Sequence, residues 1–113
     1  MRDYLWILPI LLLGFLWFRA RGASMAQLKA LAARGAQRID VRSAGEFAAA
    51  HAPGTVNIPL DQLARRAGEL DKARPVLLCC ASGSRSAMGT SLLKAKGFEA
   101  VNAGSWGRLQ ELP

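Results

Sequence analysis

Two periodicities of apolar and polar residues run along this chain, and together they predict alternating helices and strands. Apolar side chains at helical spacing follow Ser24 and stop at Gly35, which predicts one helix there. Further helices are expected over 44–50, from Asp61 to near Gly68, and from the loop after Cys80 to Lys96. Short apolar or β-branched runs predict strands over 37–41, 56–58, 76–79 and 99–102. This alternation predicts an α/β domain with a small, mainly parallel sheet flanked by helices.

Residues with strong capping preferences set the expected helix ends. Ser43 and Glu46 have the spacing of a capping box, so a short helix is expected to begin directly after the strand that ends near residue 41. Asp61 is the expected N-cap of the next helix, and Gly97 the expected residue just past the end of the last long helix.

The amino-terminal segment is apolar for longer than a buried helix of a small domain requires. Residues 4–18 carry no charge and lie between Arg2-Asp3 and the arginines at 19 and 21. Fifteen helical residues reach about 22 Å, and snorkelling arginines at both ends would extend this towards the ~30 Å hydrocarbon core. The pattern therefore predicts a transmembrane helix, with residues 1–22 as anchor and residues 23–113 as the folded domain.

The charge bias predicts the orientation of this anchor. Basic side chains follow the apolar segment, at Arg19, Arg21 and Lys29, while Arg2 before it is accompanied by Asp3. The positive-inside rule then places the domain in the cytoplasm of a bacterial cell, with the anchor in the inner membrane. The alternative is a cleaved signal peptide and export to the periplasm, although the arginines at 19 and 21 interrupt the expected cleavage pattern.

Composition limits the possible partners. The chain has 113 residues and a net charge of +7, so its field favours small anionic substrates. The basic residues are scattered without interleaved aromatic side chains, so no nucleic acid is expected. Two adjacent cysteines and one histidine form no metal-ligand pattern, and neither a metal nor a cofactor is expected. The low cysteine count fits a reducing compartment.

The strongest chemical candidate is Cys80, which lies where an apolar strand gives way to a helix. A loop of small residues in this position forms an anion-binding nest, and the helix start adds roughly half a positive charge. Both lower the pKa of a thiol and favour the nucleophilic thiolate. The competing interpretation is that Cys80 is the buried end of a strand. The composition of the following loop favours the nucleophile. The loop consists of Ala81, Ser82, Gly83, Ser84, Arg85 and Ser86.

In order along the chain, three motifs resemble the single-domain rhodanese-like sulfurtransferases. They are Ile39-Asp40-Val41-Arg42 with Glu46-Phe47, then His51-Ala-Pro-Gly54 with Asn57-Ile-Pro-Leu60, and Cys80-Ala-Ser-Gly-Ser-Arg85-Ser86. The resemblance covers roughly residues 25–113. It implies a rhodanese fold in which Cys80 accepts sulfane sulfur from a donor such as thiosulfate, as a persulfide, and passes it to a thiol or cyanide.

Within this resemblance the loop residues 81–86 are the expected substrate cradle. Their amides would hold the transferred sulfur, the Ser82 and Ser84 hydroxyls would add donors, and Arg85 would order the loop and neutralise an anionic donor. Asp40 and Arg42 are expected near the site as supporting residues, with mutual ion pairing favoured over a direct role. The sequence departs from the family pattern at Ala50 and at residues 103–106. These departures affect the expected wall of the substrate pocket, and therefore which acceptor the protein prefers.

Two alternative functions remain open. One is a non-enzymatic sulfur-carrier or regulatory module that uses the same fold to bind a partner protein at the membrane. The other is a small phosphatase or arsenate reductase, which the four residues between Cys80 and Arg85 disfavour because those enzymes have a longer loop. Cys79 and Trp106 are interpreted as packing residues and His51 as part of a turn.

Overall fold

A parallel four-stranded sheet forms the centre of the computed structural model, which describes residues 2–113 but not the side chains of Arg2 and residues 18–20. The strands are β1 (Gln37–Asp40), β2 (Val56–Asn57), β3 (Val76–Cys80) and β4 (Ala100–Ser105), in the order β2-β1-β3-β4. The parallel sheet expected from the sequence is confirmed. β4 is longer than expected and continues through Ser105, opposite the carboxyl end of β3.

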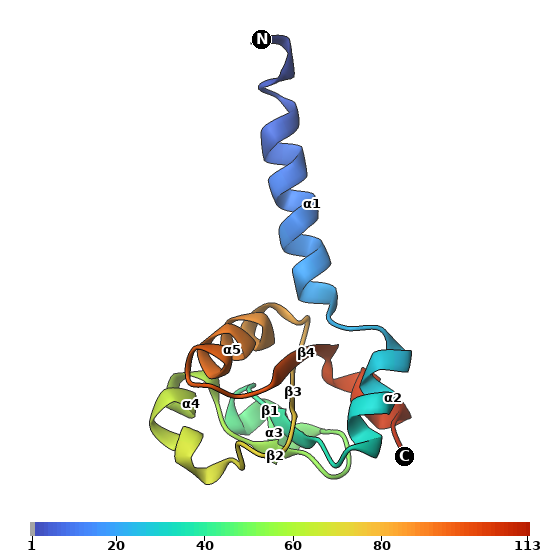
Figure 1. Ribbon diagram of the computed structural model, residues 1–113, viewed down its shortest axis with the longest axis vertical. Coiled ribbons are helices and arrows are strands. Elements are labelled where there is room, and N and C mark those ends of the chain that lie inside the picture. The colour runs from blue at the N-terminus through green and yellow to red at the C-terminus, as the bar shows by residue number, and fades with distance from the viewer. Residues whose placement is uncertain (1) are drawn as a thin grey trace.

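Helices cover the sheet on both faces (Figure 1). They are α2 (Met25–Ala33), α3 (Ala44–Ala49), α4 (Leu60–Arg66) and α5 (Ser84–Ala95), with short 3-10 helices η2 (Ala67–Glu69) and η3 (Trp106–Glu111). The capping box of Ser43 and Glu46 is formed at the start of α3, and Gly97 follows α5 with a φ of +92°.

The prediction of Asp61 as an N-cap was wrong by two positions. α4 begins at Leu60 with Pro59 as its N-cap, so Asp61 lies in the first helical turn and caps nothing with its side chain. The reason is tertiary, because the N–H of Leu60 donates to the carbonyl of Val41 and fixes the chain there.

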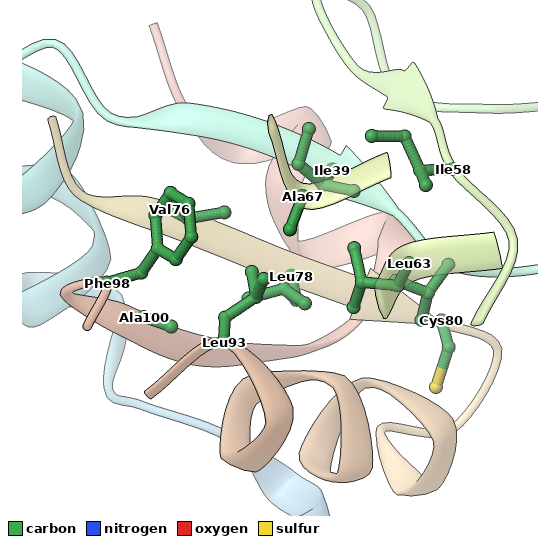
Figure 2. Close-up of a cluster of buried hydrophobic side chains, with 11 residues drawn as sticks. Ile39, Ile58, Leu63, Ala67, Val76, Leu78, Cys80, Leu93, Phe98 and Ala100 are labelled. Carbon is green, nitrogen blue, oxygen red and sulfur yellow. The ribbon is translucent and has the colours of Figure 1, made fainter. Parts of the chain in front are cut away.

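The central strand β3 is buried on both faces, and its alternation divides the core into two clusters. Val76, Leu78 and Cys80 point to one side, where they pack with residues of α4 and α5 such as Leu63 and Leu93 (Figure 2). Leu77 and Cys79 point to the other side, towards α2 and η3. The packing role expected for Cys79 is therefore confirmed.

Ahead of the domain, the helix α1 (Ile7–Arg21) stands away from it and contacts its upper edge, mainly at β4 and α5 (Figure 1). A short 3-10 helix, η1 (Arg2–Tyr4), precedes it. The large apolar side chains of α1 are mostly exposed to solvent, for example Leu8 at 61% and Trp17 at 63%.

The transmembrane helix predicted over residues 4–18 is not confirmed. Among residues 2–113 no helix is both long and apolar enough to cross a membrane. α1 has 15 residues, or about 22 Å of helix, against a hydrocarbon core of ~30 Å. The snorkelling expected of Arg2 and Arg19 lies outside the described side chains.

Candidate active site

The candidate nucleophile Cys80 is the last residue of β3, at the carboxyl end of the sheet. After it the chain makes a tight loop, and α5 begins at Ser84. Gly83 is the N-cap of α5 and has a φ of +103°, a conformation that side chains with a Cβ rarely adopt. The expected strand, loop and helix start around Cys80 are thus all present.

The Cys80 sulfur lies in a cage of hydrogen-bond donors. The N–H of Gly83 donates to Sγ at 2.9 Å, and the N–H and hydroxyl of Ser86 donate at 3.4 and 3.3 Å. In Figure 2 the sulfur points towards the first turns of α5, away from the aliphatic side chains of its cluster. The strand therefore buries the Cα and Cβ of Cys80 in the core while the loop receives its sulfur.

These donors control the ionisation of the thiol. Burial by itself raises the pKa of Cys80, but hydrogen bonds from the Ser86 hydroxyl and from the N–H groups of Ser86, Gly83 and Ser82 outweigh it. The pKa of Cys80 is consequently held below its ordinary value. The adjacent Cys79 has no such cage, and burial followed by the charge of Asp40 raises its pKa strongly.

Cys80 is fully buried, so its sulfur is covered in this conformation of the loop. The neighbouring loop residues Ala81, Ser82 and Ser84 are exposed to solvent.

A residue of α3 already holds the guanidinium of Arg85. Both carboxylate oxygens of Glu46 accept from Arg85, at 2.7 and 3.0 Å, and both side chains are a little more than one third exposed. The ion pair joins Arg85 to α3, and the charge of Arg85 is compensated within the protein. Sequence reasoning placed Glu46 in the capping box and in a family motif but did not pair it with Arg85, because no local pattern links residues 39 positions apart.

Asp40 and Arg42 form the ion pair that the sequence favoured. The Arg42 guanidinium donates to Asp40 at 2.8 to 3.0 Å, both side chains are buried, and the guanidinium also donates to the Ala50 carbonyl at 2.7 Å. The Arg42 guanidinium lies 4.8 Å from the centre of the Trp106 ring. The pair therefore supports the chain beside β3, the strand that carries Cys80.

Two other hydroxyls of the loop do not reach the sulfur. Ser82 and Ser84 lie 3.3 Å from each other, oxygen to oxygen, where donors to sulfur were expected. Sequence reasoning also missed Asn102 of β4, whose amide donates to the Gly83 carbonyl at 3.1 Å and whose Oδ1 lies 2.7 Å from the Ser86 hydroxyl. The only signal was a polar residue between the apolar residues Val101 and Ala103.

His51 follows α3, as expected for a turn residue. Its Nδ1 lies 2.8 Å from the Phe47 carbonyl oxygen, and its ring stacks on that of Phe47 at 3.8 Å. Across residues 2–113, no group of three or more histidine, cysteine or carboxylate side chains is placed to hold a metal ion.

The family model of the rhodanese-like domain matches residues 24–108, which include the sheet, the Cys80 loop and α5. The chain belongs to the rhodanese-like domain family. This confirms the resemblance stated from the motifs and the fold expected with it.

Solved structures of similar proteins include rhodanese domains from distant organisms. A human single-domain sulfurtransferase, TSTD1, is 31% identical with a TM-score of 0.63, over 81% of this chain and 96% of that one. A rhodanese-like domain protein of Staphylococcus aureus is 29% identical with a TM-score of 0.64, over 77% of this chain and 85% of that one.

Among curated proteins, the "Putative sulfur carrier protein YrkF" of Bacillus subtilis is 41% identical over 63 residues, which are 56% of this chain and 34% of that protein. The Bacillus subtilis protein YqhL is 42% identical over 64 residues. The matched part of the chain spans about half or less of the length of these two relatives.

Proposed function

We propose that this rhodanese domain is a sulfurtransferase whose Cys80 carries sulfane sulfur as a persulfide. The Cys80 thiolate attacks the outer sulfur of a donor such as thiosulfate, the sulfur–sulfur bond of the donor breaks, and sulfite leaves with the bonding electrons. A thiol or cyanide then attacks the outer sulfur of the persulfide. The second sulfur–sulfur bond breaks, and Cys80 leaves as the thiolate.

The observation that carries this proposal is the cage of donors around a single sulfur atom. Donors from Gly83 and Ser86 converge on Sγ within 3.4 Å, and they stabilise negative charge both on the thiolate and on the departing thiolate of the second step. A cradle formed around one atom suits sulfur better than a tetrahedral oxyanion, which supports sulfur transfer over phosphate or arsenate chemistry.

The test is persulfide formation on the full chain. After incubation with thiosulfate and desalting, we expect the intact mass to increase by one sulfur atom, and cyanide to reverse the increase. Cys80→Ser should show no increase. Cys79→Ala is the matched control and should behave as the wild type, because Cys79 faces the opposite core cluster.

The same experiment separates the enzyme from a carrier module. A sulfur-carrier role is favoured by the name of YrkF and by the full burial of Cys80. If thiosulfate leaves the chain unmodified but a persulfidated partner protein transfers sulfur to it, the protein is a sulfur carrier and the proposal of an enzyme is wrong.

We also propose that residues 4–18 attach the protein to a membrane, with the domain on the cytoplasmic side. Support comes from the exposed apolar side chains of α1, which stand clear of the domain. In co-sedimentation with phospholipid vesicles, Leu13→Glu should reduce binding. Met88→Glu should not, although Leu13 and Met88 are both 66% exposed. Equal binding by both variants would contradict attachment through this segment, and protease treatment of spheroplasts would report the side of the membrane.

A further inference from the structure

The side chain of Asn102 lies between β4 and the Cys80 loop and has no role in the mechanism above. Its Nδ2 donates to the Gly83 carbonyl at 3.1 Å. Its Oδ1 accepts from the Ser86 hydroxyl at 2.7 Å and from the N–H of Gly104 at 3.0 Å. One amide on the edge strand of the sheet thus binds two loop residues that donate to the sulfur of Cys80.

The neighbours of this amide fix which end is oxygen and which is nitrogen. The carbonyl of Gly83 can only accept a hydrogen bond, and the N–H of Gly104 can only donate one. The end of the amide that faces Gly104 is therefore Oδ1, and the Ser86 hydroxyl donates to that same atom.

The path of β4 directs the side chain of Asn102 towards the loop. Asn102 lies opposite Leu78, and the register then shifts so that Cys79 lies opposite Gly104. Such a shift changes where side chains point near the end of a strand. The backbone of Asn102 is also fixed from outside the sheet, because its carbonyl accepts from the N–H of Ala23 at 2.9 Å. The amide is therefore held in one place beside the loop.

This placement determines the conformation of the Ser86 side chain. A serine side chain has three staggered rotamers, and only one that keeps Oγ near Sγ allows the hydroxyl to donate to Cys80. Of the hydrogen bonds from the Ser86 hydroxyl to Cys80, Gly83 and Asn102, the bond to Asn102 Oδ1 is the shortest, at 2.7 Å. It therefore favours the rotamer in which Oγ lies 3.3 Å from Sγ.

The second donor to Oδ1 allows the Ser86 proton to change partners. When that proton turns to a thiolate at Cys80, Oδ1 of Asn102 keeps the hydrogen bond from the N–H of Gly104. The change therefore does not leave this oxygen without a donor, which would be costly at a partly buried site. The arrangement holds Ser86 in place without competing for its proton at high cost.

We propose that Asn102 is a positioning residue for the nucleophile, whose amide holds Ser86 and Gly83 where they donate to Cys80. The inference rests on the proposed function for its part in sulfur transfer, and it adds a residue from outside the Cys80 loop. Asn102 acts through Ser86 and Gly83. Without its amide, Ser86 is free to take other rotamers, and the thiolate loses a donor for part of the time. Less of Cys80 is then ionised at neutral pH.

The experiment measures alkylation by iodoacetamide as a function of pH. It uses the full chain with Cys79→Ala as the parent, which leaves one thiol, and follows the reaction by intact mass. Asn102→Ala should slow alkylation about threefold at about pH 7 and move the rate profile to higher pH. The two rates should become equal at high pH, where the thiol is fully ionised. Asn102→Val, which suits a strand and lacks both amide atoms, should give the same shift and replaces Asn102→Ala if that variant does not fold.

A double variant tests whether Asn102 acts through Ser86. If Ser86→Ala alone slows alkylation about fivefold, adding Asn102→Ala should leave the rate close to that value, instead of the about fifteenfold loss expected of independent effects. A residue that only stabilised the fold would show no such coupling in the pH profile.

Asn57→Ala is the matched control, because Asn57 also uses its amide to hold backbone groups. Its Nδ2 donates to the carbonyls of Asp40 and Arg42 at 3.0 and 2.9 Å, which ties β2 to the end of β1. This variant should lower the melting temperature and leave the alkylation profile in place.

Three results would overturn the role of Asn102: an unmoved profile in Asn102→Ala, full multiplication of the two effects in the double variant, or an equal shift in Asn57→Ala. Persulfide formation from thiosulfate is measured in parallel. If persulfide forms but the profile does not move, the proposed function stands and this inference fails. If the profile moves but the parent forms no persulfide, the proposed function fails, and only the effect of Asn102 on the thiolate stands.

Discussion

One side chain of the loop, Ser86, has more hydrogen-bond acceptors around it than it can serve. Its hydroxyl oxygen lies 3.3 Å from Cys80 Sγ, 3.1 Å from the Gly83 carbonyl and 2.7 Å from Asn102 Oδ1. A hydroxyl has one proton to donate, and a charged acceptor binds it most strongly. We therefore expect the Ser86 proton to turn to the sulfur when Cys80 ionises.

At this scale we predict that Ser86→Ala raises the pKa of Cys80. Since a hydrogen bond is worth roughly 1 kcal/mol, alkylation by iodoacetamide at neutral pH should slow about fivefold. The rate is measured as a function of pH. Ser84→Ala is the matched control, because that hydroxyl faces Ser82, and it should leave the profile in place. An unchanged profile in Ser86→Ala would mean that the hydroxyl serves Asn102 alone.

At the scale of elements, the carboxylate of Glu46 joins α3 to α5 through two sets of hydrogen bonds. Glu46 accepts from the N–H and hydroxyl of Ser43 at the start of α3, and from the guanidinium of Arg85 in the first turn of α5. The hydrogen bond from Arg85, followed by those from Ser43, lowers the pKa of Glu46 to about 2. The N-terminal cap of α3 and the Cys80 loop therefore share one ionised group.

The stability provided by this group should depend on pH. The pKa of Glu46 is about 2 in the folded protein against an ordinary value of 4.5, so its contribution is complete above about pH 4.5 and is lost as the pH falls towards 2. We expect Glu46→Gln to lower the melting temperature by a few degrees at pH 6, with the difference shrinking towards pH 2.5. Thermal unfolding followed by circular dichroism measures both.

Glu99→Gln is the comparison for this prediction. Glu99 pairs with Arg34 on the surface, where both side chains are at least half exposed, and it has no capping role. Its removal should cost less at pH 6. A Glu46→Gln difference that stays constant from pH 6 to pH 2.5 would show that the carboxylate is not the ionised link described above.

At the scale of the whole molecule, the chain carries a net charge of +7, and the thiol of Cys80 is buried. A field of this sign raises the local concentration of anions, and salt screens it over about 10 Å at 0.1 M ionic strength. The same field acts on any anionic sulfur donor that approaches the loop.

We therefore predict that alkylation of Cys80 by iodoacetate slows about threefold when ionic strength rises from about 0.02 M to about 0.5 M. Iodoacetamide is the matched neutral reagent, of nearly the same shape, and its rate should stay constant. The two rates are followed by intact mass in Cys79→Ala, which leaves one reactive thiol. Equal salt dependence for both reagents would assign the effect to movement of the loop instead of to charge.

The features that the sequence determined by itself are local ones. The apolar run of β3, the small residues of the loop and the start of α5 follow one another within residues 76–95, so Cys80 and its amide donors could be predicted. Helix caps at Ser43 and Gly97 were equally clear, since a cap depends on residues within one turn.

Only the tertiary structure decided what surrounds that loop. It pairs Arg85 with Glu46, brings the side chain of Asn102 to Ser86, and sets the chain at Arg21 against Arg108. It also buries the Cys80 side chain completely. These contacts join residues from 16 to 87 positions apart, and packing of distant elements brings them together, so no short pattern in the sequence could contain them.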